Sequence, residues 1–309
     1  MTQASGSAGQ ILIVKEVTFG VTPVTPVYKL LAQAGYGESL NSSAEEIISN
    51  VIDKARSVKA TRNGLKSSDG SLPFEFGTEG ADLVLEGLAG SKSGAGTGVS
   101  PYIYKRGSTV PSFSIEKGFT DVAQYFTLKG MKINSLELNI EPGQIVSGTC
   151  TVLGKGDPSV ATSSADASPD SVIHIPFTGI DAVVSIGGSA ANVSAFTMNI
   201  TNNLSVQNVL GSAYAYSVNA GRGEVTGTIS LLFENSDYFD MWLAESEEEI
   251  ECVLTIGAKV TTFTFAKCKF NGSGLPNIET PDGVIYTLNW RSIYDATAQS
   301  DFVISQVVS

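Results

Sequence analysis

Apolar side chains recur at every second position over much of the chain, and this alternation constrains the fold more than any other feature. A period of two places apolar residues on one face of a β-strand, whereas a helix needs a period near 3.6. The alternation is clear over 72–76, 136–140, 146–152, 225–233 and 284–290. We therefore predict antiparallel sheets with one face packed on a core.

Helical spacing is confined to short segments. Residues 81–90 and 236–246 carry leucine or aromatic residues at helical spacing, and the second segment begins at a serine that can cap a helix. A third helix is predicted over 43–55, where isoleucine and valine recur three and four positions apart. The stretches 91–100 and 154–171 are small and polar, so we predict loops there.

The net charge of −12 is unevenly divided along the chain. Residues 1–157 have 14 basic and 15 acidic side chains, whereas 158–309 have 5 and 16. The acidity argues against general affinity for nucleic acid or an anionic membrane. The first half contains a basic cluster over 54–66. Two halves of unlike charge can meet head to tail in an assembly, and this would explain the cluster. The alternative explanation is a solvated loop without a partner. The candidate inter-subunit contacts are Lys54, Arg56, Lys59, Arg62 and Lys66, and the candidate acidic partner or lumen surface is Glu245, Glu247, Glu248, Glu249 and Glu251.

Similar blocks of sequence occur twice, in the same order. Residues 58–91 and 218–246 both begin Val-x-Ala-x-Arg, pass through a strand that ends in phenylalanine, and enter a short helix beginning at aspartate. Later, FTLKGMKIN (126–134) matches FTFAKCKFN (263–271), and the offset changes because the first copy has an insert near 91–112. We predict a tandem duplication; the alternative is two unrelated sandwiches with similar strand chemistry.

The sequence offers little for catalysis or metal binding. His174 is the one histidine and lies between apolar neighbours, so we predict a structural role for it. Cys150, Cys252 and Cys268 lack the spacing of a zinc site, and their odd number fits a reducing compartment. No nucleophile elbow or phosphate-binding loop occurs in its proper context. We predict no enzyme, no catalytic residue, no cofactor and no metal.

A membrane segment is not expected either. The first ten residues lack the basic start of a signal peptide, and the apolar run after them is short. The longest uncharged stretch, 182–221, is interrupted by polar residues throughout and does not read as a spanning helix.

Several segments resemble the tail tube proteins (major tail proteins) of long-tailed bacteriophages. The stretch KEVTFGVTPVTP (15–26) is similar to the Glu-x-Thr-Phe-Gly-x-x-Pro opening of that family. Arg62 then precedes a Gly-x-Leu strand and the helix DLVLEGLAG, and 126–154 resembles the family's strand–strand–turn–strand block. In the second half, GRGEVTGTISLLF followed by an aromatic helix is similar too. The resemblance covers most of the chain.

This resemblance implies a structural virion protein without catalysis. Its fold would be a β-sandwich with a short helix, assembled in rings that stack into a hollow tube through which DNA passes to the host. With the duplication, it predicts a mainly β chain of two tandem antiparallel β-sandwich modules, each with a short flanking α-helix. The first module, with an N-terminal arm, is expected over 1–156, a linker or long loop over 157–171, and the second module over 172–309.

The resemblance implies hexameric rings for single-domain relatives. Because the predicted duplication gives this chain two modules, we expect a ring of three chains with pseudo-sixfold symmetry. Its expected partners are other copies of the chain, the tape measure and tail terminator proteins, and passing DNA that is not bound specifically. The expected location is the virion tail, after assembly in the host cytoplasm. The N-terminal arm, 54–66 and 91–112 are candidate contacts between rings, and a neutral or negative lumen would let DNA slide.

Two other classes stay open at this point. One is another virion building block, such as a baseplate, decoration or filament subunit. The other is a carbohydrate- or protein-binding β-sandwich whose platform would be Trp242, Trp290 or exposed tyrosines.

Overall fold

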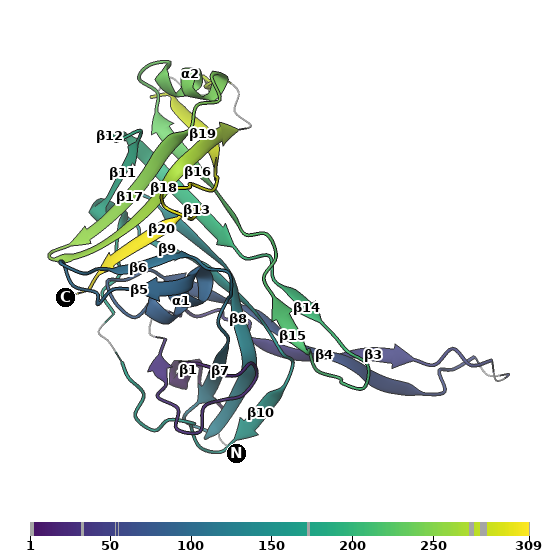
Figure 1. The fold of residues 1–309 in the computed structure, drawn as a ribbon. Coiled ribbons are helices and arrows are strands. Elements are labelled where there is room, and N and C mark those ends of the chain that lie inside the picture. Colours follow the sequence, from purple (N-terminus) through teal and green to yellow (C-terminus); the bar gives the residue numbers. More distant parts are fainter. Residues whose placement is uncertain are drawn as a thin grey trace.

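The computed structural model describes residues 3–31, 34–52, 54, 56–171, 174–271, 275–278 and 283–308, which form antiparallel β-sheets with two short α-helices (Figure 1). The elements of the first half are β1 (Gly9–Lys15), β2 (Lys29–Leu30), β3 (Asn41–Ile48), β4 (Thr61–Glu75), α1 (Asp82–Ala89), β5 (Gly90–Ser93), β6 (Tyr102–Arg106), β7 (Phe113–Phe119), β8 (Gln124–Ile140), β9 (Ser147–Gly154) and β10 (Pro158–Ala161). Those of the second half are β11 (Ala182–Ile186), β12 (Ser189–Ala190), β13 (Val193–Thr201), β14 (Ser205–Gln207), β15 (Ser217–Asn219), β16 (Glu224–Leu232), α2 (Asp237–Leu243), β17 (Glu248–Ile256), β18 (Lys259–Asn271), β19 (Ile285–Ser292) and β20 (Val303–Val307).

The strands of the two halves are paired in the same order. Antiparallel pairing gives the series β4–β9–β8–β7–β1–β2 in the first half. In the second half it gives β16–β19–β18–β17–β11–β12. Each half has its helix after the first strand of its series, and each has a short later strand, β10 or β20, on β8 or β18.

Main-chain pairing also joins the halves to each other. The C-terminal part of β8 pairs with β9 on one edge and with β13 on the other, with Phe196 opposite Ile140 and Thr201 opposite Ser135. Because β13 also pairs with β16, the pairing runs on from β4 through to β19. The strands β20 and β6 form a second link between the halves.

One contiguous hydrophobic core extends through both halves. The rings of Phe76 and Phe263, one from each half, lie with centroids 5.4 Å apart. The apolar faces predicted over 72–76 and 136–140 are buried, and this confirms the alternation there as a strand signal. The face predicted over 225–233 is buried as far as Leu231, whereas Phe233 lies beyond the end of β16 and is exposed. Area removed from water by this core is the main favourable term in folding.

The helix predicted over 81–90 is confirmed as α1. Its Leu85 and Leu88 are buried, and Gly90 ends it in the left-handed region at φ +82°, where glycine carries no steric penalty. Burial alone would raise the pKa of Asp82 at its start. The hydrogen bond and charge of Lys29 and the charge of Lys92 outweigh burial, so the pKa of Asp82 is below its usual value.

The helix predicted over 236–246 is confirmed as α2, at the far end of the molecule from the N-terminus (Figure 1). Its expected cap is not formed, because the Ser236 hydroxyl donates to the Asp240 carboxylate at 3.0 Å rather than capping a main-chain amide. None of its residues is fully buried, but Tyr238, Phe239, Met241 and Trp242 are partly buried and pack against the core.

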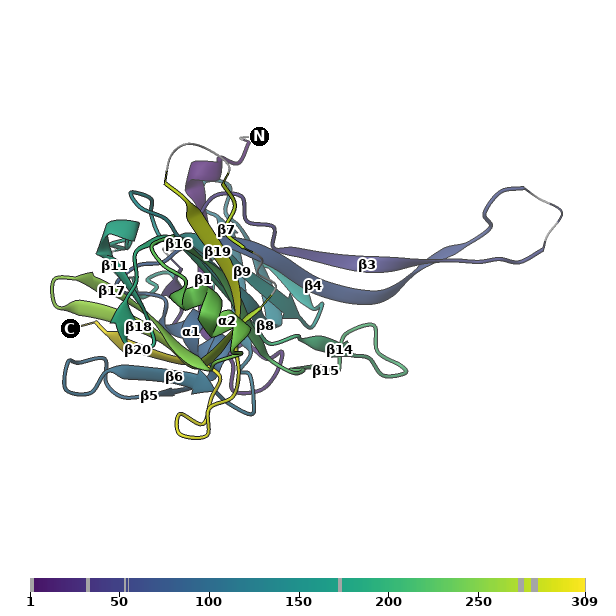
Figure 2. The same cartoon turned by 90° about the horizontal axis from the view of Figure 1, so that it is seen from above.

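The helix predicted over 43–55 is wrong. Residues 41–48 form β3, which pairs with the first part of β4 and projects from the body (Figure 2). Ile47 and Ile48 are β-branched and fit a strand, and the long β4 supplies the hydrogen-bonding partner. We call β3, β4 as far as Asp69, and the described residues between them the arm.

The loops predicted over 91–100 and 154–171 each contain strand residues. Strand β5 extends to Ser93 and pairs with β6, and β10 pairs with β8. Beyond β10, the Ser164 hydroxyl and the Ala165 amide both donate to the Glu116 carboxylate, which holds this segment against the first half. Within the described part of the chain, neither helix has the length and apolar character needed to cross a membrane.

Candidate functional site

The five basic residues predicted as subunit contacts all lie on the arm. Lys54, Arg56, Lys59 and Arg62 are exposed, close to or within the connection between β3 and β4. Lys66 lies nearer the body, where its ammonium is 3.3 Å from the Tyr214 hydroxyl and 4.9 Å from the centre of that ring. The arm therefore carries this charge outward.

The acidic run lies at the other end of the molecule. Glu247 is 3.2 Å from Lys267 and Glu245 is 3.9 Å from Lys269, whereas Glu248, Glu249 and Glu251 are on β17. Exposed ion pairs of this kind contribute little to stability. Since the arm projects from the opposite part of the body, one chain does not bring the acidic and basic sets together (Figure 1).

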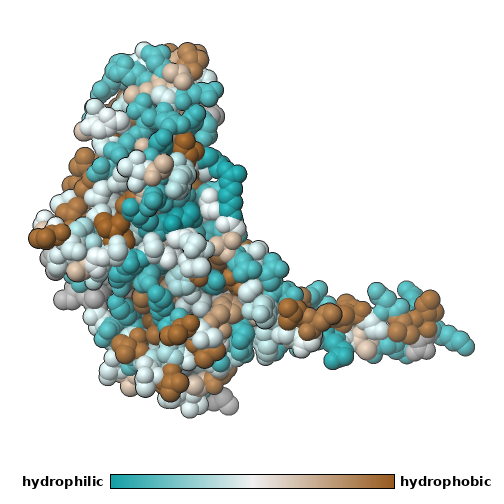
Figure 3. Space-filling view, in the orientation of Figure 1, coloured by the Kyte–Doolittle hydropathy of each residue, from teal (hydrophilic) through white to brown (hydrophobic). Residues whose placement is uncertain are grey.

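The arm also exposes apolar side chains, which appear as brown patches along it in Figure 3. The exposed fractions are 55% for Ile47, 48% for Ile48 and 99% for Ile52, and Val51 and Val58 are exposed too. Grouped apolar side chains in water are a mark of an interaction surface. In an isolated chain these side chains are exposed to solvent.

The strands from β4 to β19 present a face of small polar residues opposite the core, which we call the polar sheet face. Hydroxyls bond across neighbouring strands: Ser135 with Thr151 at 2.6 Å, Thr197 with Thr228 at 2.8 Å, and Ser230 with Thr287 at 2.9 Å. Charged residues of this face are of both signs, among them Glu137 and Arg291. Its small polar members include Ser71, Thr149, Thr151, Ser135, Asn139, Thr197, Asn199, Thr226, Thr228, Ser230, Thr287 and Asn289.

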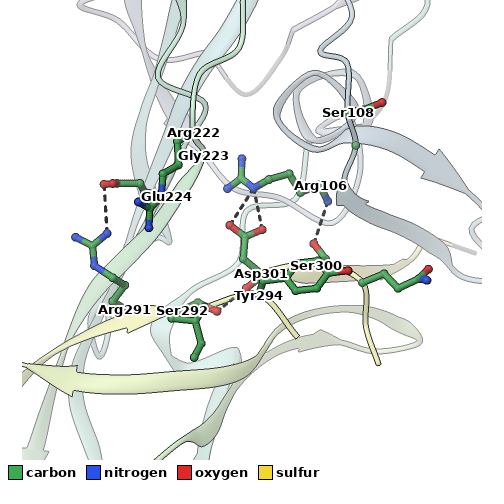
Figure 4. Close-up of a pocket in the computed structure, with 13 residues that line it drawn as sticks. Arg106, Ser108, Arg222, Gly223, Glu224, Arg291, Ser292, Tyr294, Ser300 and Asp301 are labelled. Atoms are coloured by element: carbon green, nitrogen blue, oxygen red, sulfur yellow. Dashed lines mark hydrogen bonds and ion pairs between the residues drawn. The ribbon is translucent and has the colours of Figure 1, made fainter. Parts of the chain in front are cut away.

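A pocket of about 470 Å³ lies where β6, β16, β19 and the segment before β20 meet (Figure 4). Arg106 spans its base: Nε donates to both Asp301 oxygens at 2.8 and 2.9 Å, and Nη1 donates to Asn202 Oδ1 at 2.9 Å. Its buried Nη2 has no hydrogen-bond partner among the described residues. A Cβ at Gly223 would overlap this guanidinium, so a larger residue there would require the Arg106 side chain to shift.

The rim of the pocket is both charged and aromatic. Arg291 lies 3.4 Å from the Glu224 carboxylate, Arg222 is exposed beside them, and Tyr294 is 64% exposed. These residues come from distant parts of the sequence, and only folding brings them together. Sequence reasoning missed the pocket because its residues form no local motif.

Sequence reasoning also missed the role of Glu16, although it lies in the segment that resembles the family opening. Its carboxylate is 6% exposed and accepts four hydrogen bonds. The donors are the Gly20 and Gly130 amides at 2.7 and 2.8 Å and the Ser112 and Ser114 hydroxyls at 2.7 and 2.8 Å. Glu16 thus ties the turn after β1 to β7 and β8.

The remaining reactive side chains are arranged as structural residues. His174 is half-buried and lies 3.5 Å from the Glu75 carboxylate. Burial raises the pKa of the Cys150 thiol, and of the Cys252 thiol, to about 12, which keeps both protonated and unreactive. No group of three or more potential metal ligands occurs among the described residues.

The binding-module alternative loses one of its platforms, because Trp290 is buried and stacks on Phe196 with ring centroids 5.6 Å apart. What remains is an antiparallel β-sheet protein with a projecting arm. Its exposed apolar arm and its open strand edges are features typical of subunits that contact other chains.

Comparison with known proteins names the family. The family model for the phage tail tube protein matches residues 6–292, so this chain belongs to the phage tail tube protein family. No curated protein matches the chain. The chain is therefore a non-enzymatic structural protein of the phage tail tube, a component of the virion tail, and it belongs to a family that self-assembles into the tube.

Proposed function

We propose that this tail tube protein consists of two tandem modules, 1–156 and 172–309, joined by 157–171. Two series of strands paired in the same order, each with a helix after its first strand, support this proposal. So do the sequence blocks 126–134 and 263–271, which fall on β8 and β18.

Three such chains form each ring of the tube, with six modules in pseudo-sixfold arrangement. The observation that carries this proposal is the junction of β8 with β13, because one module there completes the sheet of the other. Among the described residues after β18, Leu275 and Ile278 are exposed and form no strand, unlike the matching end of β8. A neighbouring chain would supply the missing pairing, and the head-to-tail contact would repeat until the ring closes.

The polar sheet face lines the lumen. Several of its hydroxyls bond to one another, and its charges are mixed, so it offers DNA few cationic contacts. DNA then slides past without specific binding. The basic residues of the arm and the acidic run of Glu245 to Glu251 contact other chains, because unlike surfaces of repeated modules meet in a head-to-tail assembly. The tape measure and tail terminator proteins are further partners.

Ring mass and symmetry test the proposal. Native mass spectrometry of rings released from tubes is expected to give three chains of 32.3 kDa each. A reconstruction of the tube is expected to show threefold rings with pseudo-sixfold repeats. Rings of six chains would contradict the three-chain ring, and chains whose two halves did not superpose would contradict the tandem modules.

A further inference from the structure

At the junction between the two halves, residues of the first half form a docking site for a hairpin of the second half; we call this docking site the seat. The hairpin that continues β13 and β16 through β14 and β15 lies against the first half (Figure 2). The Lys66 amide donates to the Ala213 carbonyl at 2.8 Å, and the Ala215 amide donates to the Lys155 carbonyl at 3.1 Å. Between them, Tyr214 lies against the Lys66 ammonium.

Asn134 holds the other end of this hairpin. Its side-chain Oδ1 accepts a hydrogen bond from the Leu204 amide at 2.9 Å, and its carbonyl accepts one from the Asn202 amide at 2.7 Å. The seat on the first half therefore consists of Asn134 at the root of the hairpin and Lys66 with Lys155 near its tip.

The arm occupies the same place in the first half as this hairpin does in the second. Asn41 pairs with Asp69 on the arm, and Asn199 pairs with Thr226 on β13 and β16. Counted along the pairing of β4 with β9 and of β16 with β19, Asp69 and Thr226 occupy matching positions in the two halves. The hairpins that these two residues close therefore have the same length to within one residue. One hairpin is seated, whereas the arm projects into solvent.

The second half has residues that match each part of the seat. Asn271 stands where Asn134 stands in the repeated block, at the end of β18. The Ile293 amide donates to the Lys267 carbonyl as the Lys155 amide donates to the Lys129 carbonyl, so Ile293 matches Lys155.

The match extends to Lys66 and the pocket. In the second half, Gly223 occupies the position that Lys66 occupies in the first half. Gly223 lies two residues before Val225 of β16, and Lys66 lies two residues before Ser68, the matching residue of β4. Both Gly223 and Ile293 line the pocket at Arg106. The Asn271 side chain is exposed and has no hydrogen-bond partner among the described residues.

We infer that Asn271 and the Arg106 pocket form the seat for the arm of a second copy of this chain. The inference rests on the head-to-tail ring proposed above and names its contact surface. By analogy with Asn134, the Asn271 Oδ1 accepts a hydrogen bond from a main-chain amide of the incoming arm. A main-chain carbonyl of the arm accepts one from the unpartnered Nη2 of Arg106. The apolar side chains of the arm, among them Val58, pack against the exposed Tyr294 ring.

The charges of the two surfaces allow this contact. The arm carries Glu45 and Glu46 as well as its basic residues. The pocket carries Glu224 as well as its arginines, and Arg222 at its rim is exposed. Ion pairs of both polarities are therefore available, and they fix the register of docking more than its strength.

Crosslinking within assembled tubes tests the seat directly. The variant Ser57→Cys with Ser108→Cys places one thiol on the arm and one on the pocket rim, while the three native thiols are buried. A short bis-maleimide crosslinker is expected to join neighbouring chains in tubes but not in the unassembled protein. The matched control replaces Ser57→Cys by Ile180→Cys, at an exposed site outside the arm, and is expected to give no linked chains.

The outcomes separate the seat from the ring. A denaturing gel ladder that ends at three chains supports both. A ladder that ends at six chains supports the seat and overturns the three-chain ring. Tubes that give no linked chains overturn the seat, whatever the ring size.

The pair of asparagines provides a second test that does not depend on thiol geometry. Asn271→Ala is expected to abolish ring formation while the melting temperature of the unassembled chain stays unchanged. Asn134→Ala is expected to lower that melting temperature, because Asn134 is engaged within one chain. Rings formed by Asn271→Ala in wild-type yield would overturn the inference.

Discussion

At the scale of single residues, Glu16 is a buried acidic side chain that accepts four hydrogen bonds. Four donors converge on its carboxylate, and no water is needed to satisfy it. Replacement by glutamine turns one acceptor oxygen into a donor that faces other donors. We expect Glu16→Gln to lower the free energy of unfolding by about 2 kcal/mol, since hydrogen bonds to charged groups contribute roughly 1.5–3 kcal/mol. Urea unfolding of the unassembled chain measures this change.

The matched control for Glu16 is Glu245→Gln. The Glu245 side chain is 83% exposed, and its nearest basic partner is 3.9 Å away. Surface substitutions of this kind change stability by less than about 0.5 kcal/mol. If both variants unfold at the same urea concentration, Glu16 does not have the anchoring role assigned to it.

The buried thiols predict a loss of stability at alkaline pH. Burial raises the pKa of Cys150 and of Cys252 to about 12 in the folded chain, whereas an unfolded cysteine has a pKa of about 8.5. Above about pH 8.5 the unfolded state releases protons that the folded state retains, so stability falls as pH rises. Each thiol is expected to cost about 2 kcal/mol between pH 8 and pH 10.

Removing one thiol checks the origin of this pH dependence. Urea unfolding of Cys150→Ala at pH 8 and at pH 10 is expected to show a smaller loss than the unaltered chain shows. An equal loss in both proteins would assign the effect to other groups. The variant is less stable at both pH values because it leaves a cavity, but that cost does not depend on pH.

At the scale of elements, the sequence predicted strands well and the arm badly. Alternation over 72–76 and 136–140 was decisive because one face of those strands is buried. The apolar residues of the arm, such as Ile47 and Ile52, all face solvent in the isolated chain, so no core face set their period. Their spacing fitted a helix equally well, and the pairing of β3 with β4 decided the outcome.

The arm is expected to be dispensable for folding and required for assembly. The variant Ile47→Ser with Ile52→Ser removes apolar side chains that are 55% and 99% exposed in the isolated chain. We therefore expect the melting temperature of the unassembled chain to change little and tube formation to be lost, as seen by negative-stain microscopy. Tubes of normal length and number would show that the arm surface is not an assembly contact.

An exposed isoleucine elsewhere provides the control for the arm. Ile180 is 82% exposed and lies in the short 3-10 turn before β11. The variant Ile180→Ser removes one such side chain without touching the arm. Normal tubes from this variant would show that loss of assembly in the arm variant reflects the position and not reduced surface apolarity.

At the scale of the whole molecule, the sequence indicated the family, but not the geometry of the sites. The uneven charge was visible in the counts, whereas the pocket joins Arg106, Arg222, Arg291 and Asp301 across most of the chain length. The polar sheet face was hidden for a related reason. Its serines and threonines lie between the apolar residues by which the strands were predicted. They form a continuous face only when the strands pair with one another.

The last prediction concerns DNA passage along the polar sheet face. Glu137 and Asn289 are exposed on this face, and we expect phage carrying Glu137→Lys with Asn289→Lys to assemble tubes but to eject DNA more slowly. Each lysine repeats around and along the tube, and phosphate contacts by lysine release counterions, so added salt should restore the ejection rate. Matched phage with Glu137→Gln and Asn289→Gln should eject normally, because neither change adds a cation. Ejection at the wild-type rate by the lysine variant at low salt would place this face away from the DNA.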